Sequence, residues 1–230
     1  MSPRDQILGA VRKSLGVDRA DARTTAARKA VASARLAAHQ RHPLPGRVAG
    51  KSADDLVGVL RAQLTASAVT IVDVARLADV PAAVSGYLRA QNLPQRVRFG
   101  ADETLAGLPW ASAATLEVTR GRAALSDEVG VSMPVAGVAE TGTLVLASGP
   151  ENPVTLNFVP ETHVVVLEAS RIVAGYEDAF ALVRERFGEG VMPRTVNMIS
   201  GPSRTGDIGG RIVMGAHGPR RMCVVLVGAP

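Results

Sequence analysis

Apolar and polar positions alternate in blocks along the chain beyond residue 46. Short runs of β-branched and aliphatic residues are separated by longer segments in which apolar residues recur at helical spacing. The short runs predict strands, and the longer segments predict amphipathic helices. Strands are expected at residues 69–74, 97–100, 115–119, 130–133, 142–147, 163–168, 195–199 and 222–227, and helices at residues 53–66, 80–91 and 175–187. This order predicts an α/β domain of two or three layers.

The last apolar runs are continuous rather than alternating. The segment "HVVVLEA" begins at His163, and "CVVLV" begins at Cys223. A strand loses its alternation when helices cover both faces of a parallel sheet. We therefore predict an open, mostly parallel sheet flanked by helices.

The N-terminal segment has a different pattern. Ser2-Pro3-Arg4-Asp5 provides a hydroxyl N-cap, a proline in the first turn and an acid, and an apolar stripe from Ile7 to Leu15 follows before Gly16. That stripe predicts a helix with a surface to dock against. Residues 18–42 are rich in Ala and Arg, which favours a helix or semi-ordered arm. With the linker "HPLPG" after it, the chain is predicted to divide into a helical extension, 1–45, and an α/β domain, 46–230.

Charge is concentrated in the same extension. Residues 1–50 carry a net charge of +7, whereas residues 51–230 carry −2. The arginines are scattered among alanines without interleaved aromatic residues, so a solvated helical face is favoured over nucleic-acid binding. We find no long apolar span and no apolar segment near the first residue, and we expect a cytoplasmic protein without a membrane span.

Cys223 is the one cysteine of the sequence. A single cysteine cannot form a disulfide within the chain, and it cannot hold a cluster that needs several cysteines of this chain. Because it stands in a β-branched run, we interpret it as a small core residue rather than a nucleophile.

The first loop with candidate chemistry is "GVAETGTLVLASGP", residues 137–150. Glu140 stands between a glycine-containing turn and a strand, and Thr141-Gly142-Thr143 adds hydroxyls and an unobstructed backbone. Glu140 is a candidate acid, base or nucleophile. The alternative is an exposed turn residue that caps nearby amides.

The second loop, "SGPSRTGDIGG", spans residues 200–210 and follows a predicted strand. A helix beginning near Gly206, with Thr205 or Asp207 as its N-cap, would direct backbone amides toward the same place as the hydroxyls and Arg204. Such donors suit a phosphate or carboxylate, and the carboxyl end of a parallel strand is where α/β sheets bind ligands. The alternative is a tight turn in which Arg204 pairs with an acid such as Asp207. The candidate ligand-binding residues of this loop are Gly201, Ser203, Arg204, Thr205 and Asp207.

The third loop contains His217, just before the last strand. A histidine there can serve a site near neutral pH, or it can hydrogen-bond the backbone of its own turn. The other histidines are His39, His42 and His163, and none has metal-ligand spacing with another ligand. We therefore predict no bound metal and no cofactor.

The loops together resemble the LUD-domain family. The resemblance is carried by "GVAETGTLVLASGP", "PETHVVVLEASRIVAGYEDAF" and "ISGPSRTGDIGGRIVMGAHGPRRMCVVLV", and it is strong over residues 130–228. It implies the fold shared by glucosamine-6-phosphate deaminase, ribose-5-phosphate isomerase and coenzyme A transferases. It also implies a cytosolic bacterial role in oxidising L-lactate to pyruvate together with two iron–sulfur partner proteins.

The resemblance also bears on the site residues. Glu140 falls in "AETGT", and Ser203, Arg204, Thr205 and Asp207 fall in "GPSRTGDI", so the two loops are expected to form one cleft. Related coenzyme A transferases use a glutamate nucleophile in a similar short motif, although Thr141 stands here in place of the amide residue. Lactate oxidation needs an electron acceptor, and this chain lacks clustered cysteines and a dinucleotide-binding glycine pattern.

Three hypotheses follow. The leading one is an accessory, non-redox subunit of a lactate-oxidising complex whose iron–sulfur partners hold the redox centres, with a cleft for a small anionic metabolite. The alternative is an acyl-CoA transferase or sugar-phosphate isomerase that uses Glu140. The third is a scaffold that has no ligand and docks through its N-terminal arm.

Overall fold

The computed structural model describes residues 2–16, 22–208 and 211–229 of the 230-residue chain. The chain divides into two compact units, residues 1–43 and residues 44–230.

The first unit contains two helices, α1 (Pro3–Ser14) and α2 (Ala22–Ala38). α1 begins as predicted, because the Ser2 side chain accepts a hydrogen bond from the Asp5 amide and Pro3 stands in the first turn. No residue of α1 is buried, and the side chains of Ile7 and Leu15 are 65% and 66% exposed. The apolar stripe predicted from the sequence is therefore present, and its side chains are exposed within the described residues.

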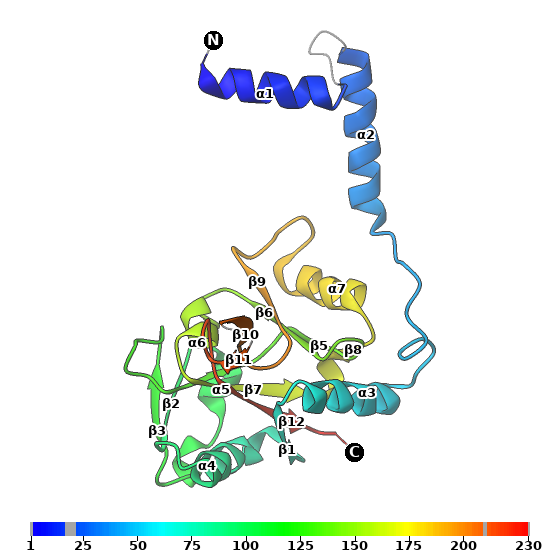
Figure 1. Ribbon diagram of the computed structural model, residues 1–230. Helices are drawn as coiled ribbons and strands as arrows, with labels where there is room; N and C mark the ends of the chain where they lie inside the picture. The colour runs from blue at the N-terminus through cyan, green and yellow to red at the C-terminus, as the bar shows by residue number, and fades with distance from the viewer. Residues whose placement is uncertain (1, 17–21, 209–210, 230) are drawn as a thin grey trace. The chain divides into compact units, whose positions relative to one another are not determined.

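The second unit is built on a six-stranded parallel sheet (Figure 1). The strand order is β1-β12-β7-β4-β2-β3, and each neighbouring pair is parallel. The strands are β1 (Thr70–Val74), β2 (Arg96–Phe99), β3 (Glu117–Arg120), β4 (Val129–Ser132), β7 (Thr162–Glu168) and β12 (Arg221–Val227). β7 and β12, the continuous apolar runs of the sequence, lie side by side near the middle. The predicted open parallel sheet is confirmed.

Alternate residues of the central strands belong to cores on opposite faces of the sheet. Val164 and Val166 of β7 pack in one core with residues of α4 (Val80–Ala90), α5 (Glu103–Gly107) and the 3₁₀ turn η2 (Trp110–Ser112). Another 3₁₀ turn, η1 (Leu77–Asp79), directly precedes α4. Val165 and Leu167 pack in the other core with residues of α3 (Ala53–Ala66). This double coverage explains why the strands read as unbroken apolar runs.

A second, four-stranded sheet was not predicted as a separate layer. Its order is β8-β5-β6-β9, in which β6 is antiparallel to both of its neighbours and β5 is parallel to β8. The strands are β5 (Ala136–Val138), β6 (Thr143–Ala147), β8 (Ile172–Val173) and β9 (Val196–Ile199). Leu144 and Leu146 join the α3 core, and Val145 and Ala147 join a third core with α7 (Tyr176–Phe187). β6 and β9 were predicted as strands, but they form an antiparallel pair in this mixed sheet rather than belonging to the parallel one.

The segment after β9 is a hairpin, and the helix predicted near Gly206 is wrong. Arg204–Ile208 forms β10, which pairs antiparallel with β11 (Arg211–Met214). The β-branched pair Ile212-Val213 favours a strand, and a Gly-Gly pair between two strands is typical of a hairpin. Two short elements complete the unit, α6 (Val154–Phe158) and the 3₁₀ turn η3 (Ala169–Arg171).

Close packing of α6 on β4 gives a test of the fold. A Cβ at Gly130 of β4 would lie 2.5 Å from the Leu156 carbonyl oxygen, which belongs to the backbone. We expect Gly130→Ala to lower the free energy of unfolding by about 3 kcal/mol, because backbone must move to accept the methyl group. Urea denaturation followed by circular dichroism measures this change.

The matched control is Gly58→Ala in α3. Gly58 is exposed, and a Cβ there would meet nothing within 4 Å. The added helix propensity should raise the free energy of unfolding by up to about 1 kcal/mol. Changes of the same sign and size at both glycines would contradict the close approach at Gly130.

Candidate functional site

The two glycine-containing loops predicted from the sequence touch through their hydroxyl groups. β6 and β9 pair so that Leu144 lies opposite Ile199, which places Thr143 beside Ser200. Thr143 Oγ1 and Ser200 Oγ are 2.6 Å apart. Thr141 Oγ1 lies 2.7 Å from Thr143 Oγ1, and both lie 2.9 Å from the Tyr176 hydroxyl. The four hydroxyls form one hydrogen-bonded cluster that joins the loops.

Glu140 lies near the start of α7. Its backbone N–H donates to the Ala174 carbonyl at 3.2 Å, and a Cβ at Gly175 would be 3.7 Å from Glu140 Oε2. Gly142 has φ +68°, and a Cβ there would lie 2.8 Å from the Cβ of Gln63 in α3. This turn therefore requires glycine for both conformation and space.

A cavity of about 270 Å³ lies beside the second loop. Its lining residues are Asn157, Phe158, His163, Met198, Ile199, Ser200, Gly201, Pro202, Ser203, Arg204, His217, Gly218, Pro219 and Met222. The cavity thus brings together four predicted residues, namely Gly201, Ser203, Arg204 and His217. Glu140 and the Thr141–Thr143 turn do not line it.

The cavity lies at the amino ends of parallel strands, not at the carboxyl ends as expected. His163 is the second residue of β7 and Met222 the second residue of β12. The expectation failed because β9, which leads into the loop, belongs to the antiparallel sheet.

Ser203 holds the second and third loops together. Its backbone N–H donates to the Pro219 carbonyl at 2.8 Å, and its carbonyl accepts from Gly215 N–H at 2.9 Å. Its hydroxyl oxygen accepts from the His217 backbone N–H at 3.2 Å. These bonds place the exposed His217 and Arg204 side chains on the same cavity.

The other predicted residues of this segment lie in or near the hairpin. Thr205 is buried in β10. Asp207 also belongs to β10, but its side chain lies outside the described residues. Gly201 has φ +83°, and a Cβ there would lie 2.7 Å from the Ser67 carbonyl oxygen, so the turn accepts only glycine without rearrangement.

Three buried polar side chains that the sequence did not single out form the floor beside this cavity. Ser132, Asn157 and His163 are each at most 1% exposed. Ser132 Oγ donates to Asn157 Oδ1 at 3.2 Å, and it lies 2.9 Å from His163 Nε2. Because the single hydroxyl proton goes to Asn157, the imidazole donates its Nε2 proton to Ser132. Burial keeps that imidazole neutral by lowering the pKa of His163 to about 4.

Asn157 is left with an unused donor. Its Nδ2 is buried and has no hydrogen-bond partner in the described part of the chain. A buried amide group without a partner destabilises a fold by about 1–3 kcal/mol. Asn157 is one of the residues that line the cavity. An Asn four residues beyond Pro153, in the short segment Val154–Phe158, carries no sequence signal that would have identified it.

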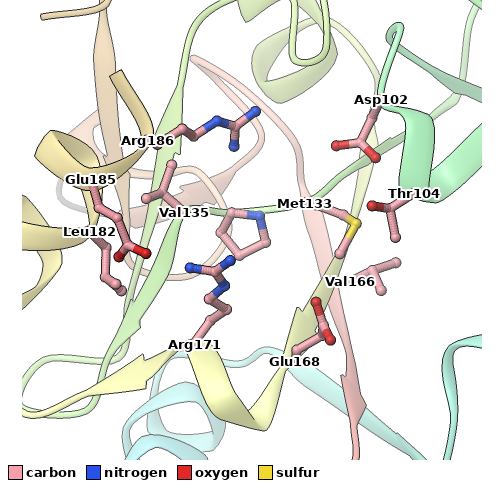
Figure 2. Close-up of a pocket in the computed structure, with 11 residues that line it drawn as sticks. Asp102, Thr104, Met133, Val135, Val166, Glu168, Arg171, Leu182, Glu185 and Arg186 are labelled. Carbon is pink, nitrogen blue, oxygen red and sulfur yellow. The ribbon is translucent and has the colours of Figure 1, made fainter. Parts of the chain in front are cut away.

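A second cavity, of about 350 Å³, lies at the carboxyl ends of β4 and β7 (Figure 2). The residues that line it are Asp102, Thr104, Met133, Pro134, Val135, Val166, Glu168, Arg171, Leu182, Glu185 and Arg186. They come from α5, the ends of the parallel strands, η3 and α7. None was predicted as a site residue, because they are single charged residues spread over separate elements.

The remaining predictions concern metals, membranes and the cysteine. Among the described residues, no group of three or more His, Cys, Asp or Glu side chains is arranged to hold a metal ion. No helix in the described ranges is long and apolar enough to cross a bilayer. Cys223 is fully buried in the core, as interpreted, and burial raises the pKa of its thiol to about 12.

Comparisons with known proteins identify a family. The model of the LUD domain matches residues 64–227. A protein named lactate utilization protein C from Geobacillus kaustophilus is 29% identical over 78% of this chain and 81% of its own length. An uncharacterized protein of Neisseria meningitidis is 39% identical, but the match covers 44% of this chain and only 42% of that protein.

A solved structure shares the fold. The crystal structure of a DUF162 family protein from Deinococcus radiodurans covers 77% of this chain and 99% of its own, with a TM-score of 0.59 and 23% identity. At that identity the likeness concerns the fold alone.

The buried imidazole predicts a pH dependence of stability. Above about pH 6.5 the side chain of His163 is neutral in both the folded and the unfolded chain. As the pH falls from 6.5 toward 4, the unfolded chain binds a proton that the folded chain does not. His163 should therefore lower the free energy of unfolding across this window, by up to about 3 kcal/mol at its acid end.

Denaturation at a series of pH values, for wild type and His163→Gln, measures this contribution. The glutamine amide can still donate to Ser132 but does not titrate. The free energy of unfolding of the wild type should fall toward that of His163→Gln as the pH falls, because only the wild type carries the buried imidazole. A difference that stays constant from pH 7 to pH 4 would contradict a buried, neutral histidine.

Proposed function

The chain belongs to the LUD domain family, and on that premise we propose that it acts in lactate utilization as an accessory subunit that binds a small anionic metabolite. In this proposal the oxidation of L-lactate to pyruvate takes place in a cytoplasmic complex. The redox centres belong to iron–sulfur partner proteins, since this chain has one cysteine and that cysteine is buried. The names of relatives such as the Geobacillus kaustophilus protein support the lactate role.

The observation that carries the proposed ligand site is the unpartnered Asn157 donor in the cavity beside Arg204. The guanidinium of Arg204 is exposed and forms no ion pair in the described part of the chain, and it is a cationic donor of several hydrogen bonds. A carboxylate bound in the cavity would accept from both groups. Charge-assisted hydrogen bonds of this kind are about twice as strong as neutral ones.

The rest of the lining supports an anion over other ligands. None of the lining side chains is an aspartate or glutamate, and Ser200 and Ser203 add hydroxyls. Phe158, Met198 and Met222 provide apolar walls for a short carbon chain. The volume of about 270 Å³ is near the lower limit of ligand pockets. These features fit a small monocarboxylate such as L-lactate or pyruvate.

Arg204→Ala tests the anion site. We expect calorimetric affinity for L-lactate or pyruvate to fall about tenfold or more, because a charged hydrogen-bond partner is lost. Growth on lactate of a strain that relies on the variant should fall with it. The matched control is Arg96→Ala, whose arginine is 58% exposed and pairs with Glu117 on β3, away from the cavity. Unchanged binding and growth in Arg204→Ala would reject the site.

Substitution of Glu140 distinguishes this proposal from the enzyme alternative. If the chain is an acyl-CoA transferase or a sugar-phosphate isomerase, Glu140→Gln abolishes turnover, because an amide is a poor nucleophile and a poor base. If it is an accessory subunit, Glu140→Gln supports growth on lactate like wild type and binds the anion with unchanged affinity. Turnover of acyl thioesters or sugar phosphates by the purified chain, lost in this variant, would favour the enzyme.

A further inference from the structure

The cavity at the carboxyl ends of β4 and β7 has a different chemistry from the cavity at Arg204. The two lie at opposite ends of β7, since His163 lines one and Glu168, the last residue of the strand, lines the other. The cavity at Glu168 occupies the edge of a parallel sheet at which α/β proteins commonly bind ligands. It is also larger, at about 350 Å³.

This cavity is lined by charges of both signs. The carboxylates of Asp102, Glu168 and Glu185 face the same space as the guanidinium groups of Arg171 and Arg186. In Figure 2 Arg171, Arg186 and Glu185 lie on the side of α7, and Asp102 and Glu168 lie across the cavity with Met133 between these two carboxylates.

These charges are not paired with one another. The side chains of Glu168, Arg171, Glu185 and Arg186 form no hydrogen bond or ion pair within the described residues. The guanidinium of Arg186 lies over the Phe187 ring, 5.5 Å from its centre. Asp102 accepts from the Leu105 backbone N–H at 2.9 Å as the N-cap of α5. Elsewhere the chain does pair its arginines at short range, as Arg98 does with Asp127 at 2.7 Å. In this cavity, by contrast, the described carboxylates and guanidinium groups line one space without forming an ion pair.

We propose that this cavity is a second ligand site, for a small zwitterion of the amino-acid type. A carboxylate of the ligand binds Arg171 and Arg186, and its ammonium group binds Asp102 and Glu168. Met133, Val135 and Leu182 contact an aliphatic side chain. A ligand with only a negative charge would be repelled by the carboxylates, and a ligand with only a positive charge would be repelled by the arginines. The site does not depend on the anion cavity.

The test is a calorimetric titration of the intact chain with each standard L-amino acid. At least one is expected to bind with a dissociation constant of about 1 mM or tighter. The amino acid that binds is then compared with the amine that lacks its carboxylate and with the acid that lacks its amino group. Each analogue should bind at least about tenfold more weakly, because one set of charged hydrogen bonds is lost.

Two variants assign the binding to this cavity. Arg171→Gln and Glu168→Gln should each lower the affinity for the amino acid about tenfold or more, while circular dichroism shows an unchanged fold. Arg204→Ala should leave amino-acid affinity unchanged, and Arg171→Gln should leave anion affinity unchanged, so failure of one site is distinguishable from failure of the other. The proposal is overturned if no amino acid binds, if an analogue with one charge binds as tightly, or if both glutamine variants bind like wild type.

Discussion

The site at Arg204 depends on one constraint, which is that buried polar groups need hydrogen-bond partners. Ser132, His163 and Asn157 are buried where β4, β7 and α6 meet, and the three side chains can satisfy one another only in part. The Ser132 hydroxyl donates its proton to the Asn157 side-chain oxygen, and the His163 imidazole donates its proton to Ser132 Oγ. The asparagine N–H group then has no partner among the described residues, and Asn157 is one of the residues that line a cavity. Under the proposed function, a ligand supplies the acceptor that this donor lacks, and Arg204 favours a ligand with a negative charge.

The loops around this floor are shaped by the second sheet. Antiparallel pairing of β6 with β9 brings Thr143 against Ser200, and the hydroxyl cluster fixes the start of the Ser200–Arg204 turn. Ser203 then carries the connection to the Gly215–Pro219 turn through three hydrogen bonds. Arg204 is positioned by this series of contacts rather than by a helix N-terminus. In the proposed site, side chains rather than helix amides therefore bind the anion.

The sequence was sufficient for some elements and not for others. β7 and β12 were predictable because burial on both faces leaves an unbroken apolar run, and α1 because its cap, proline and stripe all agree. The partner of β9 was not predictable, since four residues of a short strand do not specify the sheet they join. Arg204, Ser203 and His217, which line one cavity, were singled out from local composition. Asn157 and Glu168 were not singled out, because their proposed roles depend on what lies across each cavity and not on their sequence neighbours.

The most direct measurement is the side-chain amide signal of Asn157, followed by nitrogen–proton NMR during titration of the whole protein with L-lactate or pyruvate. The account predicts that both protons of this amide shift progressively and saturate at the dissociation constant found by calorimetry, and that the shift disappears in Arg204→Ala. An Asn157 signal that stays fixed while the anion binds elsewhere, or while no anion binds at all, would contradict it.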